Sequence, residues 1–257
     1  MRQLGVVLKS VSNMNKTAII LGATGLTGGL LLQKLIDDNR YSTIKLFSRT
    51  RIEGLPNKVI QFIVNILELE RYRTDFIADE VYCCIGTTAK KTPNKKLYKK
   101  IDYGIPVTAA KLAKENDIPT FLVISAMGAN KASNVFYNRT KGEMEQDVLQ
   151  QGIKNTLILR PSLIGGERNE RRVLEKIGIV VFKIIQPLFI GPLKKYKTIN
   201  AESIAQAMVN LANNVSKTEI IITSDNIKQI AEKKKKIDIY GIIRQIKLEI
   251  CRQGNER

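Results

Sequence analysis

Apolar and amphipathic segments alternate along this chain. Short, β-branched runs that are apolar at successive positions are typical of strands buried on both faces of a parallel sheet. They predict strands at residues 17–21, 44–48, 59–64, 80–86, 120–125 and 156–160. The amphipathic segments between them predict helices at residues 26–38, 95–116 and 137–151. This alternation predicts an α/β fold, a doubly wound parallel sheet of the Rossmann type with right-handed crossovers.

The alternation changes after residue 160. A Gly- and charge-rich loop leads into an apolar segment, residues 173–186, which we interpret as a buried or interfacial helix. A helix near 202–213 and a strand at 219–223 follow. We expect residues 16–231 to form one nucleotide-binding domain, in which the segment 163–200 is a small cap on the substrate side.

The two ends of the chain differ from this domain. We expect residues 1–15 to be a flexible extension; its basic residues without acidic ones allow organelle targeting as a weaker interpretation. Residues 232–257 form a basic tail in which isoleucines recur at helical spacing, so an amphipathic helix is predicted. Such a helix can pack on the body or on a partner subunit, which we favour, or lie on a membrane surface. A homodimer is compatible with the first use.

Composition narrows the classes of function. The net charge is +18, of which residues 233–257 carry +5, so the excess is spread along the whole chain. With no interleaved aromatic run, this favours phosphorylated ligands over sequence-specific nucleic acid. Three cysteines suit a reducing compartment, and we expect a cytoplasmic protein. The absence of histidine excludes His-dependent catalysis and argues against a metal site.

A glycine motif, GATGLTG, follows the first strand and opens the first helix. Gly22 permits a tight turn, Gly25 lets the backbone approach a pyrophosphate, and Gly28 lets the helix pack closely. The helix start, with its free N–H groups, attracts the phosphates, and Thr24 and Leu26 flank the middle glycine. The position between strand and helix predicts a dinucleotide site.

The end of the second strand indicates which dinucleotide binds. A preference for NAD usually places an acidic residue here, but the chain has Ser48 and Arg49, 21 residues after Gly28. A guanidinium is always charged and can donate two hydrogen bonds to a 2′-phosphate. We therefore predict NADP(H) as the cofactor.

Ser125, Tyr137 and Lys141 form a candidate catalytic group. Ser125 ends the fifth strand, and Tyr137 and Lys141 lie four positions apart on the next helix, hence on one face. A lysine ammonium favours the phenolate and lowers the tyrosine pKa. Tyr137 would then be the general acid/base, Lys141 would tune it and bind the cofactor ribose, and Ser125 would orient the substrate oxygen. Tyr137 and Lys141 are thus also predicted to contact the cofactor.

These features resemble the short-chain dehydrogenase/reductase superfamily, with Ser125, Tyr137 and Lys141 as its serine, tyrosine and lysine. More narrowly, the chain resembles the Tat-interacting-protein-like branch of atypical members over residues 16–231. The segments that carry this resemblance are CCIGTT at 83–88, ID at 101–102, SAMGANKASNVFYNRTKGEMEQ at 125–146 and LRPSLIGGERNERR at 159–172.

The resemblance implies further cofactor-binding residues. Asn65, followed by Ile66, stands where the superfamily often has an adenine-binding Asp. Additional positions are implied near the cofactor and at the start of the nicotinamide-side loop. They are Gly86, Thr87, Thr88, Arg160 and Pro161.

Taken together, the sequence predicts an NADP(H)-dependent oxidoreductase acting on a small carbonyl/alcohol pair. Two alternatives stay open: an NADP(H)-binding regulatory protein with little or no turnover, and an enzyme like the nucleotide-sugar epimerases, which share the glycine spacing. The small C-terminal part disfavours the epimerase.

Overall fold

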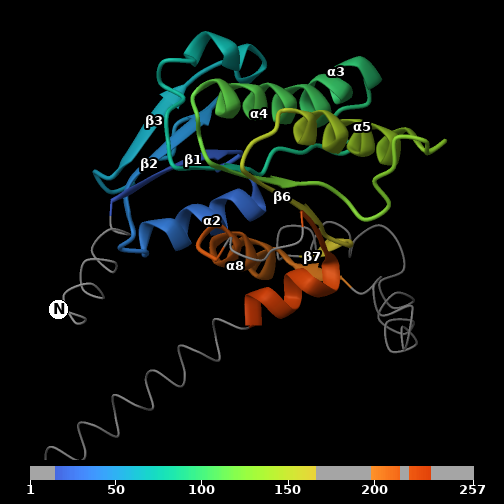
Figure 1. The fold of residues 1–257 in the computed structure, drawn as a ribbon. Coiled ribbons are helices and arrows are strands. Elements are labelled where there is room, and N and C mark those ends of the chain that lie inside the picture. Colours follow the sequence, from blue (N-terminus) through green and yellow to red (C-terminus); the bar gives the residue numbers. More distant parts are fainter. Residues whose placement is uncertain (1–14, 166–197, 215–219, 233–257) are drawn as a thin grey trace, which may run out of the picture.

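The structure, a computed structural model, describes residues 15–165, 198–214 and 220–232. Its centre is a parallel sheet of seven strands in the order β3-β2-β1-β4-β5-β6-β9 (Figure 1). The strands are β1 (Lys16–Leu21), β2 (Tyr41–Ser48), β3 (Val59–Ile63), β4 (Glu80–Cys83), β5 (Thr120–Ile124), β6 (Asn155–Arg160) and β9 (Ile221–Thr223). The predicted doubly wound Rossmann fold is confirmed.

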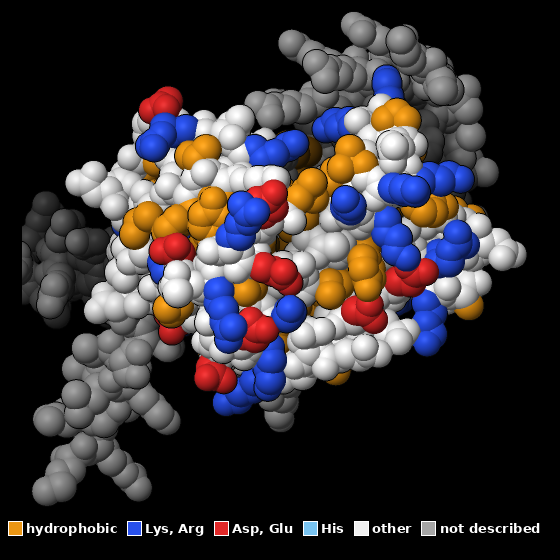
Figure 2. Space-filling view, turned by 90° about the horizontal axis from the view of Figure 1, so that it is seen from above, with side chains coloured by type: hydrophobic (Ala, Val, Ile, Leu, Met, Phe, Trp, Pro, Cys, Tyr) orange, Lys and Arg blue, Asp and Glu red, His pale blue; other side chains and the backbone are white. Residues whose placement is uncertain are grey.

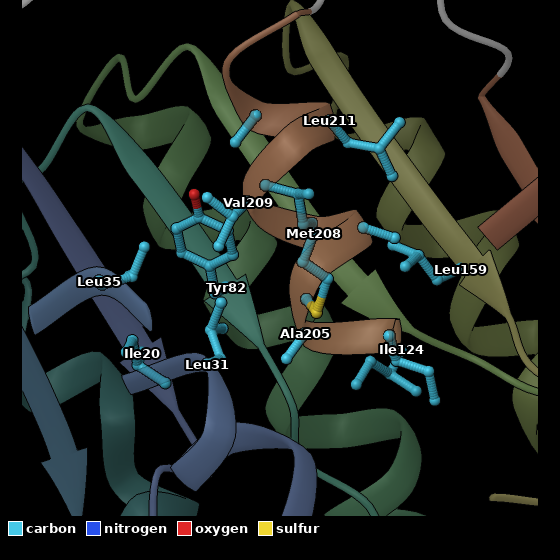
Figure 3. Packing of buried hydrophobic residues seen from close by; sticks show 14 of the residues in the cluster. Ile20, Leu31, Leu35, Tyr82, Ile124, Leu159, Ala205, Met208, Val209 and Leu211 are labelled. Atoms are coloured by element: carbon cyan, nitrogen blue, oxygen red, sulfur yellow. The ribbon is translucent and has the colours of Figure 1, made fainter. Parts of the chain in front are cut away.

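Helices cover both faces of the sheet. On one face, α2 (Leu26–Ile36) lies beside α8 (Ala201–Ala212), and residues 224–232 are helical (Figure 1). Figure 3 shows how residues of α2 and α8 such as Leu31 and Met208 meet the strand residues Ile20 and Leu159 in a buried cluster. On the other face, α4 (Ile105–Glu115) and α5 (Phe136–Gln150) cover a second cluster. The core is therefore two apolar layers with the sheet between them.

The predicted helix at 95–116 is interrupted by a wider turn. It consists of α3 (Lys95–Lys99), the π-helical turn η2 (Lys100–Gly104) and α4. Pro106 explains the interruption, because it lacks the N–H that would bond the carbonyl of Asp102 in an α-helix, and its ring crowds that carbonyl. The π turn ends just before α4 and presents Asp102 in a buried position.

Some elements were not predicted from the sequence. The 3-10 turns η1 (Ile66–Tyr72) follow β3, and a small parallel pair joins β7 (Ile164–Gly165) to β8 (Ile199–Asn200). The expected extension, the apolar helix 173–186 and the basic tail lie outside the described residues, apart from residue 15 of the extension and residue 232 of the tail. Within the part that is described, no helix is both long and apolar enough to span a membrane.

A buried polar cluster joins the amino-terminal ends of the strands. The carboxylate of Glu80, 2% exposed, accepts hydrogen bonds from the hydroxyls of Tyr41 at 2.7 Å and Tyr82 at 2.6 Å and pairs with the Lys16 ammonium at 2.5 Å. Its groups satisfy one another, as buried polar groups must. The opposite edge, at the carboxyl ends of the strands, is where open α/β sheets bind ligands, at the point where strand order reverses between β1 and β4.

Candidate functional site

The glycine turn lies at this switch point. Gly22 has φ +87°, in the left-handed region that only glycine adopts easily, and a Cβ there would come within 2.9 Å of the Cys84 carbonyl oxygen. At Gly28 a Cβ would come within 2.1 Å of the Gly22 carbonyl oxygen. The fold itself thus requires both glycines.

Gly25 differs from the other two glycines. It is exposed, and a Cβ there would meet only the Gly22 oxygen, at 3.2 Å. It is also the N-cap of α2, has no side-chain cap, and no acidic residue follows in the first turn. The first N–H groups of a helix have no partner within the helix, so those of α2 are available to a ligand. Thr24 beside them is exposed, and Leu26, the first residue of α2, is half-buried. This backbone fits an anionic phosphate group, which a Cβ at Gly25 would crowd.

The ends of β2 and β3 adjoin this turn. The Ser48 hydroxyl is buried and donates to the Thr50 carbonyl at 2.7 Å, whereas Arg49 is exposed. Among the described residues, no carboxylate lies within ion-pair distance of Arg49. The Asn65 amide oxygen accepts from the Leu67 N–H at 3.2 Å as the N-cap of η1, and within the described residues its NH₂ group makes no hydrogen bond, so it can donate to a base. The Ile66 side chain is buried, which leaves its backbone.

The predicted catalytic group comes together at the carboxyl ends of β4, β5 and β6. Tyr137, in the first turn of α5, is 40% exposed, whereas Lys141, one turn further, is buried. The Lys141 ammonium donates to the carbonyl of Ile124 at 3.4 Å, directly before Ser125. One face of α5 therefore brings the tyrosine and the lysine to the end of the strand that carries the serine.

Lys141 forms a buried ion pair. Its Nζ lies 3.0 Å from Oδ1 of Asp102, and the two side chains are only 4% and 1% exposed. The direction is poor for a hydrogen bond, and Oδ1 has no other partner in the described structure. The second oxygen, Oδ2, accepts from the backbone N–H of Thr87 at 2.8 Å. Asp102 thus connects the proposed catalytic lysine to the predicted cofactor loop after β4.

Ser125 has an unexpected partner. Its hydroxyl donates to Oε1 of Glu145 at 2.5 Å. The guanidinium of Arg160 donates to both oxygens of the same carboxylate, at 2.9 Å to Oε1 and 2.5 Å to Oε2. Glu145 is 4% exposed and lies four residues after Lys141, on the same face of α5. The Ser125 hydroxyl reaches a substrate oxygen only if it leaves this bond.

The pKa of Tyr137 departs from expectation. Burial raises it above the ordinary value, the Lys141 ammonium lowers it, and the Asp102 carboxylate raises it again. Lys141 therefore lowers the pKa of Tyr137, as predicted. Burial raises this pKa by more, and the Asp102 carboxylate opposes the effect of Lys141. In the protein alone, Tyr137 holds its proton as an acid near neutral pH.

The loop between β5 and α5 packs tightly against the helix. A Cβ on Gly142 would lie 2.2 Å from the Lys131 N and 2.3 Å from the Asn130 carbonyl carbon. The Asn130 N–H also donates to the carbonyl of Asn138 at 3.0 Å. This contact fixes the start of α5, and with it Tyr137, against the loop that follows Ser125.

The remaining predicted residues lie around this group. Gly86 and Thr88 are exposed in the loop after β4, and the Thr87 hydroxyl is 2.9 Å from that of Thr92. Pro161 is buried, and its carbonyl accepts from the Met127 N–H at 2.9 Å, which ties the ends of β5 and β6 together.

Sequence reasoning missed two members of the site, Asp102 and Glu145. Each had a signal in the sequence. Asp102 stands four residues before Pro106, a proline that interrupts the helix, and Glu145 stands four residues after Lys141, on the same helix face. Spacing alone did not show that either carboxylate is buried, because neighbouring elements decide that.

Comparisons with known proteins identify the family. The chain is 30% identical over 206 residues to the protein FMP52, mitochondrial, of Debaryomyces hansenii, covering 77% of this chain and 88% of that one. It is 32% identical over 236 residues to FMP52-2, mitochondrial, of Scheffersomyces stipitis, covering 86% and 98%. The chain belongs to the FMP52 family. The protein HTATIP2 of Rattus norvegicus is 32% identical over 162 residues, covering 62% of this chain and 66% of that one. The predicted place in the Tat-interacting-protein-like branch of atypical short-chain dehydrogenases/reductases is confirmed.

Solved structures agree with this fold, although no family model matches the chain. The ADP-L-glycero-D-manno-heptose-6-epimerase of Helicobacter pylori has a TM-score of 0.58 at 18% identity, with 85% of this chain and 82% of that one covered. The L-threonine dehydrogenase of Clostridium difficile has a TM-score of 0.57, also at 18% identity, with 81% and 75% covered.

The expected cytoplasmic location has to be corrected. The FMP52 relatives of three yeasts, Debaryomyces hansenii, Candida albicans and Scheffersomyces stipitis, are named mitochondrial proteins, which contradicts it. The cysteine content misled the prediction, because a reducing environment does not distinguish between these compartments.

Proposed function

We propose that the protein is an NADP(H)-dependent oxidoreductase that interconverts a small carbonyl compound and its alcohol. The observation that carries this proposal is the arrangement of Tyr137 and Lys141. The phenol is 40% exposed, at the carboxyl edge of the sheet, while the ammonium below it is buried and electrostatically coupled to it. Membership of a dehydrogenase/reductase branch adds support.

The proton steps follow from this arrangement. A bound nicotinamide dinucleotide supplies the hydride for reduction or accepts it for oxidation. In reduction Tyr137 gives its O–H proton to the carbonyl oxygen, and the Lys141 ammonium stabilises the phenolate that remains. Solvent then returns the proton to Tyr137, whose exposed edge gives water access. Burial raises the pKa of Tyr137, so in the protein alone the phenol carries the proton that the reductive direction requires.

The cofactor proposal rests on the glycine turn and on Arg49. The turn offers an exposed glycine and outward N–H groups to a pyrophosphate. Arg49 is exposed at the end of β2 with no carboxylate partner in the described residues, so its guanidinium is free for a 2′-phosphate. Solved structures of similar fold named as complexes with NAD or NAD⁺ support a nicotinamide dinucleotide in general.

A screen of carbonyl compounds with NADPH tests the activity, with Tyr137→Phe beside the native protein. We expect turnover to fall at least about a hundredfold in the variant, the lower range for loss of a general acid. Tyr103→Phe, which removes a phenol from the neighbouring η2, is the matched control and should keep its activity. Equal turnover in native protein and Tyr137→Phe would refute the proton relay.

A second titration tests the cofactor preference by comparing NADPH with NADH. We expect NADPH to bind at least about tenfold more tightly, and Arg49→Ala to remove most of that difference. Arg73→Ala, an exposed arginine at the end of η1, serves as the control for net charge. Equal affinities in the native protein would contradict the role given to Arg49.

The regulatory alternative has an observation of its own in its favour. The Ser125 hydroxyl is held by Glu145, and Asp102 counteracts the effect of Lys141, so both helpers of Tyr137 have other partners. If NADPH binds but no carbonyl compound in the screen is reduced, a cofactor-sensing role is the better proposal.

We further propose a mitochondrial location, supported by the names of the FMP52 relatives and by the amino-terminal segment. Residues 1–13 contain Arg2, Lys9 and two serines but no acidic residue, a composition typical of mitochondrial targeting segments. Fluorescence microscopy of the full chain, and of a chain lacking residues 1–13, tests this. Diffuse cytosolic signal from the full chain would refute it.

A further inference from the structure

A pocket of about 310 Å³ opens beside Tyr137, and Thr87 and Thr88 of the predicted cofactor loop after β4 form one side of it. Its walls come from the loop after β4, the start of α3 and the start of α5. The volume is at the lower end of the range of small-molecule sites, enough for one ring with its substituents. Because Tyr137 forms part of the wall, a molecule in this pocket lies against the proposed proton donor.

Part of the wall is aromatic. Tyr98 and Phe136 meet edge to face with ring centroids 5.6 Å apart, and Pro93 lies in the same lining. Tyr98 is buried and its position is fixed by the turn from α3 into η2. Two rings held in this way present a preformed apolar surface, which favours a flat apolar body over a sugar with hydroxyls on every side.

A cation completes the lining. The Lys95 Nζ lies 5.7 Å from the centroid of the Phe136 ring, so the ammonium is held at the edge of the aromatic wall. Among the described residues, no carboxylate lies within ion-pair distance of it. Lys99, by contrast, pairs with Glu143 at 2.6 Å. Lys95 therefore has charge to offer to a ligand, whereas Lys99 has a protein partner.

Neighbouring lysines extend this positive charge. Lys90, Lys91 and Lys96 are exposed around the same loop and helix start, and in the described structure none has an acidic partner. Figure 2, which looks onto the side of the molecule with α3 to α5, shows Lys and Arg side chains among apolar ones, with fewer acidic side chains between them. Such a field draws anionic molecules toward the mouth of the pocket.

We propose that this pocket binds the substrate of the proposed reductase and that the substrate is a carbonyl compound with a flat apolar body and a carboxylate. The ring lies against Tyr98 and Phe136, the carboxylate pairs with Lys95, and the carbonyl faces Tyr137. This inference rests on the proposed function for the reaction, but binding in the pocket stands apart from turnover. In the reaction the carbonyl carbon gains a hydride from the reduced cofactor, and its oxygen gains the proton of Tyr137, which gives an alcohol and the oxidised cofactor.

The test uses a matched pair of probes, 4-formylbenzoate and its methyl ester, which differ in the charge. Binding to the full chain is followed by ligand-observed NMR without cofactor, and turnover by NADPH absorbance. We expect the carboxylate to bind about fivefold more tightly than the ester, the size of one partly exposed ion pair. Lys95→Gln should abolish that difference. Lys114→Gln, which removes an exposed lysine at the far end of α4, should preserve it.

A second variant examines the aromatic wall. Phe136→Leu should weaken binding of the methyl ester, because it removes ring contact, and should weaken the carboxylate at least as much, because the same ring holds the Lys95 ammonium. Equal affinity of the two probes in the native protein, absence of binding by both, or the same response of Lys95→Gln and Lys114→Gln would overturn the inference. Carboxylate-selective binding without turnover would leave the pocket assignment intact and refute the reductase. Turnover of both probes that is unchanged in Lys95→Gln would support the reductase and refute the pocket assignment.

Discussion

The ion pair between Asp102 and Lys141 allows the sharpest quantitative prediction. The two groups lie 3.0 Å apart, with side chains 1% and 4% exposed. Removing one partner of a buried pair leaves an uncompensated charge and typically costs about 3–5 kcal/mol. Asp102→Asn keeps an oxygen for the Thr87 N–H and loses only the charge, so we expect a loss near the lower end, about 3 kcal/mol.

A double-mutant cycle isolates this interaction. Lys141→Met should also cost about 3 kcal/mol, because it leaves the Asp102 carboxylate with the Thr87 N–H alone. The double variant contains no buried charge, so its loss should fall well short of the sum, with a coupling energy of about 3 kcal/mol.

The cycle is measured by urea unfolding followed by circular dichroism, with linear extrapolation to water. Lys99→Gln with Glu143→Gln forms the control cycle, because that pair is 47% and 31% exposed and should couple by less than about 1 kcal/mol. If the Asp102 and Lys141 substitutions are additive to within about 0.5 kcal/mol, the two groups do not interact as the structure indicates.

Three further results are expected. Gly142→Ala should destabilise the fold by more than about 2 kcal/mol in the same urea assay, because its Cβ would overlap the Lys131 backbone. Gly104→Ala, whose Cβ would meet only an oxygen at 3.9 Å, should be neutral or stabilising; similar losses for both would refute the packing argument. Glu145→Gln should cost about 2–3 kcal/mol of unfolding free energy, because it weakens the charged contact with Arg160, while Glu143→Gln, at an exposed pair, should cost less than about 1 kcal/mol. The hydrogen bond to Asp147, aided by burial, raises the pKa of Tyr103 to about 12. The free energy of unfolding should therefore fall as pH rises from about 10 to 12, and should fall less in Tyr103→Phe. An equal fall in both proteins would exclude Tyr103 as a cause.

The sequence by itself determined the fold and the approximate place of the site. Strand and helix positions followed from residue periodicity, because a strand buried on both faces needs apolar residues at every position. The glycine turn could also be predicted from the sequence, since the positive φ of Gly22 and the contact of Gly28 with the Gly22 carbonyl are set within a few residues, although the approach of Cys84 to Gly22 is tertiary. The spacing of Tyr137 and Lys141 placed both on one helix face for the same local reason.

The tertiary structure alone decided the electrostatics of the site. Asp102 lies 39 residues before Lys141 in the chain, and only the π turn before Pro106 and the packing of α5 against η2 bring them together. The partner of the Ser125 hydroxyl is likewise set by α5 and β6, which present Glu145 and Arg160. Local patterns fix which way a side chain points along its own element. The sign and size of a pKa shift depend on burial and on charges from distant segments, which no local pattern encodes.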